Sequence, residues 1–190
     1  MSLNRLLTMN TLAENSSAKC IAFRGKEGLS FDFDFTLTVL VDRPLKANHL
    51  LGKSQGVTLH SQGIQRHFHG IINAITRVNS LSPPLQAYDI NLTPRISLLC
   101  LHHDCRNYQN QSVIDIVRFW FQYFGITDCD FSQLTKTYPP LDYVVQFNES
   151  AWDRIRRLLS QAGIFYYFTF TKSQHRIHFA DSPSAYAHET

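Results

Sequence analysis

The sequence has few cysteines, no long apolar run and no N-terminal export signal. No window approaches the ~20 consecutive apolar residues that span a bilayer, and Met1 to Ser17 lacks a basic segment followed by an apolar stretch. The four cysteines, which form no CxxC pair, are Cys20, Cys100, Cys105 and Cys129. These absences predict a protein made in the cytoplasm with reduced thiols and without stable membrane insertion. Export by a route that needs no signal peptide stays open.

Dense charge and the common catalytic motifs are also missing. Lys and Arg number 18 against 15 Asp and Glu, a net charge of +3, and the nearest approach to a basic run is Arg154-Ile155-Arg156-Arg157. A nucleic-acid interface usually shows a basic stripe or cluster, so none is expected here. The sequence contains no GxSxG, HExxH, P-loop or GxGxxG. A Ser-His-Asp triad stays open, because such triads assemble in space.

The first half of the chain has the pattern of antiparallel strands. Apolar and polar residues alternate from Phe31 to Val41, which predicts a strand with one buried and one solvated face. Further strands are expected at Gly56 to His60, His67 to Val78 and Tyr88 to Leu92, with turns at Gln62-Gly63 and Ser82-Pro83-Pro84. The last two strands should pair as an antiparallel hairpin.

The second half changes to a helical period twice. Ser112 and Ser150 each precede an apolar helix with an Asp three residues on, and the helices should end at Phe124-Gly125 and Ala162-Gly163. Strands are expected at 143–147, 164–171 and 176–179, the last two turning near 172–174. The fold class is therefore mainly β with two helices (α+β). We expect a lead-in at 1–18, a first β domain at 19–98, a second α+β domain at 99–181 that need not be complete, and a polar tail at 182–190.

Two clusters of ionisable residues could carry chemistry. His102, His103, Asp104 and Cys105 are competent metal ligands, but neighbours on a strand point to opposite faces, so only His103 and Cys105 would converge. The alternative is a solvated loop before the Ser112 helix. His67 and His69 share a strand face and could serve a metal or acid–base site, although a purely structural role is the simpler interpretation.

Three further groups also have a functional and a structural interpretation. The carboxylates of Glu149 and Asp153 could act in acid–base catalysis, but the positive end of the Ser150 helix explains them better. The run Phe165-Tyr166-Tyr167-Phe168 could stack bases, but it more simply forms a core strand. The three arginines Arg154, Arg156 and Arg157 should form a solvated helix face, or else meet an acidic partner surface.

Several phrases resemble the first domain of the VgrG family of type VI secretion spike proteins. They are Phe23-Arg24-Gly25-x-Glu27-Gly28-Leu29-Ser30, Arg66-x-Phe68-His69-Gly70-Ile71, Tyr88-Asp89-Ile90-x-Leu92-x-Pro94, Ser112-Val113-x-x-Ile116-Val117, Tyr138-Pro139-Pro140-x-x-Tyr143-x-x-Gln146-Phe147-x-Glu149-Ser150 and Leu158-Leu159-x-x-Ala162-Gly163-Ile164-Phe165-Tyr166-Tyr167-Phe168. The resemblance implies antiparallel barrel-like β domains of the phage tail hub type. It also implies a homotrimer in the full-length protein, docking on an Hcp-like tube, effector cargo and export by the type VI apparatus.

The resemblance favours a structural, non-enzymatic part with no cofactor, metal or catalytic residue. This chain departs from the family pattern because it contains only the first part of the hub region, without an oligosaccharide-binding-like domain or a needle. Two alternatives stay open: a metal-dependent hydrolase using the His102–Cys105 cluster, and a phage or prophage tail baseplate protein.

Overall fold

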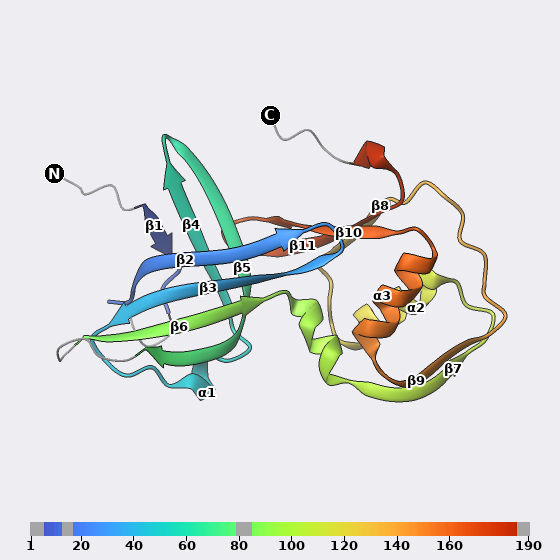
Figure 1. Ribbon diagram of the computed structural model, residues 1–190, viewed down its shortest axis with the longest axis horizontal. Coiled ribbons are helices and arrows are strands. Elements are labelled where there is room, and N and C mark those ends of the chain that lie inside the picture. Colours follow the sequence, from blue (N-terminus) through green and yellow to red (C-terminus); the bar gives the residue numbers. More distant parts are fainter. Residues whose placement is uncertain (1–5, 13–16, 79–84, 186–190) are drawn as a thin grey trace. The chain divides into compact units, whose positions relative to one another are not determined.

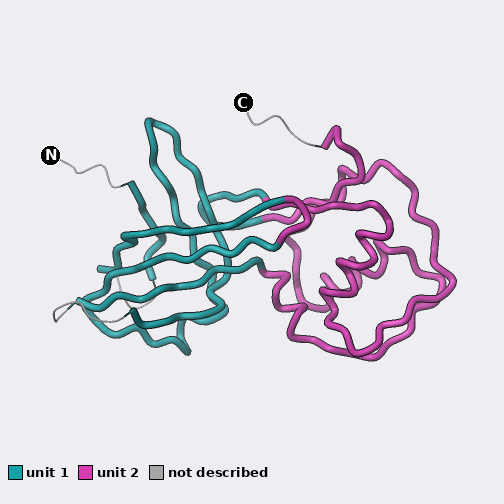
Figure 2. Tube along the Cα trace, viewed as in Figure 1, with its two compact units in different colours: residues 1–28, 32–94, 169–175 teal, residues 29–31, 95–168, 176–190 magenta. Residues whose placement is uncertain are grey.

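The computed structural model describes residues 6–12, 17–78 and 85–185 (Figure 1). The expected turn at Ser82-Pro83-Pro84 lies outside the described residues, as does about half of the expected lead-in and tail. The chain forms two compact units (Figure 2): unit 1 comprises 1–28, 32–94 and 169–175, and unit 2 comprises 29–31, 95–168 and 176–190. Each unit is described by itself below.

Unit 1 is built on a six-stranded sheet with the order β1-β4-β5-β6-β3-β2. Its strands are β1 (Leu7–Met9), β2 (Lys19–Gly28), β3 (Phe31–Val41), β4 (Ser54–Ser61), β5 (Ile64–Val78) and β6 (Gln86–Thr93). The pairs β1–β4, β4–β5, β5–β6 and β3–β6 are antiparallel. The edge strands β1 and β2 lie close to each other, so the sheet is curled. This confirms a mostly β, curled antiparallel architecture.

The strongest sequence pattern forms the centre of this sheet. Phe33, Phe35, Leu37, Val39 and Val41 on β3 are all at most 1% exposed, as the period of two predicts. The β4–β5 hairpin turns at Gln62-Gly63, where both residues have positive φ (49° and 84°), and it projects beyond the rest of the sheet in Figure 1. The turn signal in the sequence is therefore confirmed.

The segment Thr169–His175 belongs to unit 1, although it comes from the far end of the chain. The Phe170 ring lies 5.1 Å from the Phe33 ring and 5.5 Å from the Phe35 ring, centroid to centroid. The carbonyl of Lys172 accepts a hydrogen bond from Asn10 Nδ2 (3.2 Å). A Cβ at Gly56 would lie 2.4 Å from the same carbonyl, so this backbone approach requires glycine.

Unit 2 packs two helices with short strands. They are α2 (Val113–Tyr123), α3 (Ala151–Gln161), β7 (His103–Tyr108), β8 (Cys129–Gln133), β9 (Val144–Ser150), most of β10 (Phe165–Phe170) and most of β11 (His175–Ala180). β7 and β9 pair antiparallel, and a second sheet has the order β10-β11-β8 with β8 and β11 parallel. Trp120 and Trp152 are at most 1% exposed in a shared core.

Both predicted helices begin and end where the sequence indicates. Ser112 Oγ accepts from Asp115 N (3.2 Å) and Ser112 N donates to the Asp115 carboxylate (3.1 Å), a complete capping box. Ser150 Oγ accepts from Asp153 N (3.0 Å). Gly125 and Gly163 follow the two helices at φ 64° and 68°, where a residue with a Cβ would be strained.

Several elements were not predicted. The two-helix expectation omits α1 (Ala47–Leu50) and the 3₁₀ segments η1 (Arg95–Leu101) and η2 (Pro183–Ala185) within the described residues. It also omits β1, β7 and β8. These elements are short, and three to seven residues are too few to establish a period. None of the helices in the described part of the chain is both long and apolar enough to cross a membrane.

Candidate functional site

The His102–Cys105 cluster does not form a single site. The interpretation of this stretch as a solvated loop is wrong, because residues 103–108 form β7, paired with β9. The ring of His102 packs among aromatic side chains, 4.9 Å from the Trp120 ring and 6.0 Å from the Tyr123 ring. Asp104 forms an ion pair with Arg106 (3.3 Å), and Cys105 is an exposed free thiol.

Metal-binding geometry is absent from the described ranges 6–12, 17–78 and 85–185. They contain no group of three or more His, Cys, Asp or Glu side chains placed to hold an ion. The metal-hydrolase alternative therefore has no structural support. Two pockets of the described residues have volumes of about 410 and 400 Å³. The first is lined by His60 and the second by Arg156 and Tyr166, and neither of these two pockets is lined by a carboxylate.

His67 and His69 have separate partners. His67 Nδ1 lies 2.9 Å from Thr58 Oγ1, across the β4–β5 pair. His69 is buried, and its Nδ1 lies 3.0 Å from Nδ1 of His175. The structure therefore joins His69 to a residue 106 positions away, and sequence reasoning could not have found this pair because no local pattern links the two positions.

The two carboxylates near the start of α3 have different roles. Asp153 accepts a hydrogen bond from Ser150 Oγ (2.7 Å) at the helix N-terminus, as the structural interpretation predicts. Glu149 lies at the end of β9 and forms an ion pair with Arg157 (2.5 Å). Asp153 also pairs with Arg156 (3.0 Å). Both carboxylates are occupied by stabilising contacts.

Arg154 corrects the sequence interpretation of its helix. Arg156 and Arg157 are exposed as expected, but Arg154 is 0% exposed, so its assignment to a solvated face is wrong. Its Nη1 donates to Tyr108 Oη (2.5 Å) and to Gln146 Oε1, and its guanidinium lies 4.4 Å from the Tyr108 ring centroid. Burial lowers the pKa of Arg154, while Tyr108 counteracts this.

The aromatic side chains of β10 pack mainly against other residues of unit 2. Tyr166 is 2% exposed, and its ring meets the Trp152 ring at 5.4 Å in an edge-to-face contact. Tyr167 stacks on His178 (5.0 Å) and donates to Gln133 Oε1 (2.9 Å). The core-strand interpretation explains these rings better than base stacking does.

Asp181 is a polar centre that the sequence analysis missed. Its carboxylate accepts hydrogen bonds from the backbone N–H of Thr135 (2.9 Å) and of Lys136 (2.8 Å), and from Tyr138 Oη (2.7 Å). Burial alone would raise its pKa, but these bonds hold the pKa of Asp181 well below its usual range. Burial and the bond to Asp181 raise the pKa of Tyr138. The donors lie more than forty residues earlier in the chain.

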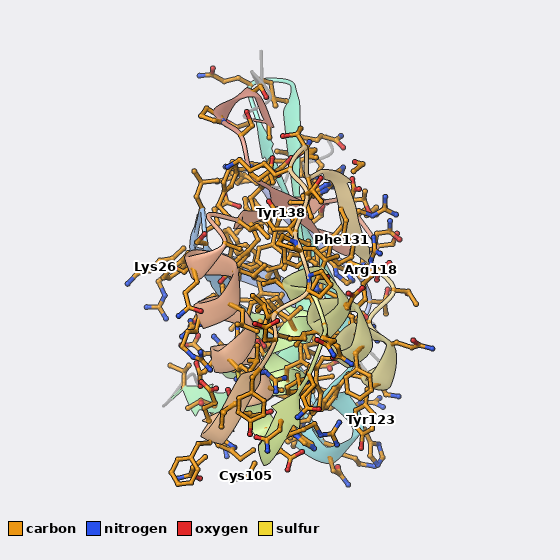
Figure 3. The ribbon with its side chains drawn as sticks, turned by 90° about the vertical axis from the view of Figure 1, so that its right-hand side faces the viewer. Lys26, Cys105, Arg118, Tyr123, Phe131 and Tyr138 are labelled. Carbon is orange, nitrogen blue, oxygen red and sulfur yellow. The ribbon has the colours of Figure 1, made fainter. Side chains whose placement is uncertain are left out.

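Unit 2 exposes apolar side chains on one face of β9 and just before it. Tyr143, Val145 and Phe147 are 53%, 44% and 79% exposed, and we call these residues the β9 strip. Tyr123 and Cys105 are also exposed, and Figure 3 shows both at the end of unit 2 opposite Tyr138. Arg118 covers the Phe131 ring at 5.1 Å, side by side in Figure 3. An exposed apolar surface such as the β9 strip is typical of a contact surface rather than a catalytic site.

Comparisons with known proteins agree with this geometry. Residues 26–190 match the family model of the phage tail baseplate hub (GPD). The chain is 34% identical over 164 residues to the type VI secretion system spike protein VgrG1b of Pseudomonas aeruginosa. This alignment covers 85% of this chain and 22% of VgrG1b. The chain thus spans about a fifth of the length of that relative.

Solved structures show the same fold. The E. coli c3393 protein superimposes with a TM-score of 0.83 at 26% identity, covering 95% of this chain and 50% of that one. That protein is a component of the type VI secretion system with structural similarity to the T4 bacteriophage tail proteins gp27 and gp5. A chain of a Francisella PdpA–VgrG complex matches with a TM-score of 0.64 at 14% identity, covering 84% of this chain and 26% of that chain. The chain belongs to the phage tail baseplate hub (GPD) family and is a homologue of the VgrG spike proteins.

Proposed function

We propose that this chain is the N-terminal hub part of a VgrG-like type VI secretion spike, with a structural rather than catalytic role. The observation that carries the proposal is the fold shared with the E. coli c3393 protein over almost the whole chain. The curled antiparallel sheet of unit 1 supports it, because a densely hydrogen-bonded sheet is a stiff body suited to transmitting force.

The proposal extends to partners. The full-length protein is a homotrimer, docks on an Hcp-like tube and carries effectors, and it leaves the cell through the type VI apparatus. The β9 strip is our candidate for one contact surface, because alternate side chains on one face of a strand can seat against a partner. We retain 19–98 and 99–181 as the proposed hub domains.

The decisive experiment measures binding of the chain to purified Hcp hexamers by biolayer interferometry, with its mass followed by light scattering. We expect saturable binding that Phe147→Asp weakens and the matched control Arg156→Asp leaves unchanged. If the chain forms the proposed homotrimer by itself, light scattering should give three times the 21.9 kDa chain mass. Absence of both binding and self-association at the highest attainable concentration would overturn the docking proposal.

A role in a phage or prophage tail baseplate is the second candidate, favoured by the description of the matching family. The two functions differ in the tube protein that is bound. Selective binding to a phage tail tube protein, with no binding to Hcp, would establish the baseplate role and exclude the type VI role.

A further inference from the structure

Unit 2 contains a pocket that the proposed hub function does not use. Its lining residues come from the C-terminal half of α3, the start of β10 and the turn between β2 and β3, and we call it the α3–β10 pocket. Its volume is about 400 Å³, which lies within the range of ligand-binding clefts. All of its lining residues belong to unit 2, and none of them belongs to the β9 strip.

The buried wall of the α3–β10 pocket is apolar. Leu159, Ile164 and Tyr166 line it, and each of them is at most 3% exposed. Gly163 also lines the pocket, and a Cβ built on this glycine would meet no other described residue within 4 Å, apart from its neighbours in the chain. The space beside Gly163 is therefore open and can receive an apolar side chain of a ligand.

Arg156 gives the pocket a positive charge, and no Asp or Glu is among the described residues that line it. One nitrogen of its guanidinium, Nη2, pairs with Asp153 Oδ1 (3.0 Å), but the two side chains are 49% and 53% exposed. An exposed pair of this kind stabilises a helix only slightly. Arg156 can therefore bind a carboxylate of a ligand at small cost, and its planar group suits that geometry.

The negative end of the α3 dipole lies near the pocket but is largely satisfied. The carbonyls of Leu158, Leu159 and Ser160 each accept a backbone hydrogen bond from residues 162–164, at 2.9 to 3.1 Å. These are the carbonyls of the last turn, which carry the negative charge of a helix dipole. Arg156 lies more than one turn before the end of α3, so an anion bound at its guanidinium does not meet free carbonyls.

The turn between β2 and β3 adds apolar surface at the pocket rim. It consists of Leu29 and Ser30, whereas a two-residue hairpin turn usually contains Asn-Gly or Asp-Gly. Ser30 lines the pocket with a left-handed φ of 49°, and its N–H donates to the Tyr166 carbonyl (2.7 Å). Leu29 and Phe31, on either side of Ser30, are 50% and 45% exposed. Exposed apolar side chains beside a pocket are typical of a contact surface for a protein partner.

We propose that the α3–β10 pocket docks a partner protein through a peptide segment that carries a carboxylate next to an apolar side chain. The carboxylate accepts hydrogen bonds from the Arg156 guanidinium, and the apolar side chain fills the space beside Gly163 against Leu159 and Ile164. A free anion would use only the charge, whereas a peptide segment also covers the apolar wall and the rim. The proposal goes beyond the hub function and does not depend on docking to a tube.

Backbone amide spectra of the ¹⁵N-labelled chain test the proposal. The probe is the capped peptide acetyl-Leu-Asp-Leu-amide, and acetyl-Leu-Asn-Leu-amide is the matched probe of the same shape without the charge. A probe of this size binds weakly, so it is titrated into the millimolar range. We expect the shifts to cluster at Ser30, Gly163 and Ile164. The acidic probe should bind about fivefold or more tightly than the neutral probe, because its carboxylate gains charge-assisted hydrogen bonds.

Two variants on α3 separate the pocket from the general charge of the helix. Arg156→Gln should bring the two probes within about twofold of each other in affinity. The matched control Arg157→Gln should retain the preference for the acidic probe, since Arg157 pairs with Glu149 and does not line the pocket. Both arginines are exposed, and the amide spectra of the variants show directly that the fold is kept.

Four results would overturn the proposal. They are no shift at the pocket with the acidic probe, equal affinity for both probes, a preference that survives Arg156→Gln, and the same shifts with sodium acetate at equal concentration. The last result would mean that the pocket takes a free anion rather than a peptide segment. Because the β9 strip does not line this pocket, binding to Hcp is a separate measurement, and its failure would leave this test unaffected.

Discussion

Arg154 offers the sharpest test of how unit 2 is stabilised. Its guanidinium lies 4.4 Å from the Tyr108 ring centroid and 5.2 Å from the Trp120 ring centroid. Nη1 donates to Tyr108 and Gln146, while Nε and Nη2 are buried without a hydrogen-bond partner. No carboxylate is within ion-pair distance of it among the described residues. We therefore expect a volume-filling apolar side chain to replace Arg154 at small cost.

The two substitutions Arg154→Ala and Arg154→Met separate packing from charge. Arg154→Ala leaves a cavity and an unpaired Gln146 Oε1, so the free energy of unfolding should decrease by about 3–5 kcal/mol. Arg154→Met fills most of the volume and removes a desolvation cost of several kcal/mol. Tyr108 Oη loses the bond from Arg154 but keeps Trp120 Nε1 as a donor (3.0 Å), so only Gln146 Oε1 is left without its donor. We expect Arg154→Met to lie within about 1 kcal/mol of the unmodified protein.

Urea unfolding followed by tryptophan fluorescence measures this directly, because both tryptophans of the chain lie in unit 2. The exposed Arg156 is the control: Arg156→Met removes a surface ion pair and should change the free energy of unfolding by less than about 1 kcal/mol. Equal losses for Arg154→Met and Arg154→Ala would refute the reasoning, because the charged network would then be the stabilising element. A loss below about 1 kcal/mol for Arg154→Ala would show that the side chain is not buried.

Three further substitutions probe other parts of the fold. Ser112→Ala removes a capping box and should lower the free energy of unfolding by about 1 kcal/mol, measured by urea titration; no change would mean that the cap is not formed. Asp181→Asn should lower the melting temperature at neutral pH. Because hydrogen bonds depress the pKa of Asp181, the difference from the unmodified protein should shrink as pH decreases below about 4, and a pH-independent difference would contradict this. Gly70→Ala would bring a Cβ within 2.9 Å of Leu92 Cβ, so calorimetry should show a loss of about 1–3 kcal/mol, whereas unchanged stability would contradict the close packing.

Part of the fold is readable from the sequence because its causes are local. The alternation from Phe31 to Val41 marks which face of the strand is buried, since successive side chains point to opposite faces. Ser112 and Ser150 mark helix starts because their hydroxyls satisfy amides three residues away. The family phrases add the order of these elements, and the hub architecture follows from that order.

The tertiary structure decided everything that depends on distant partners. Arg154 occupies a helix position with exposed arginines two and three residues away, yet it is buried because Tyr108 and Trp120 cover it. His69 and Asp181 acquire their roles from residues 106 and 46 positions away. The burial of a polar side chain and its long-range hydrogen bonds produce no periodic pattern in the sequence, because they depend on which segments meet after folding. The sequence alone determined most of the longer strands, the two helix starts and the family resemblance, whereas only the tertiary structure decided which polar groups are buried and paired.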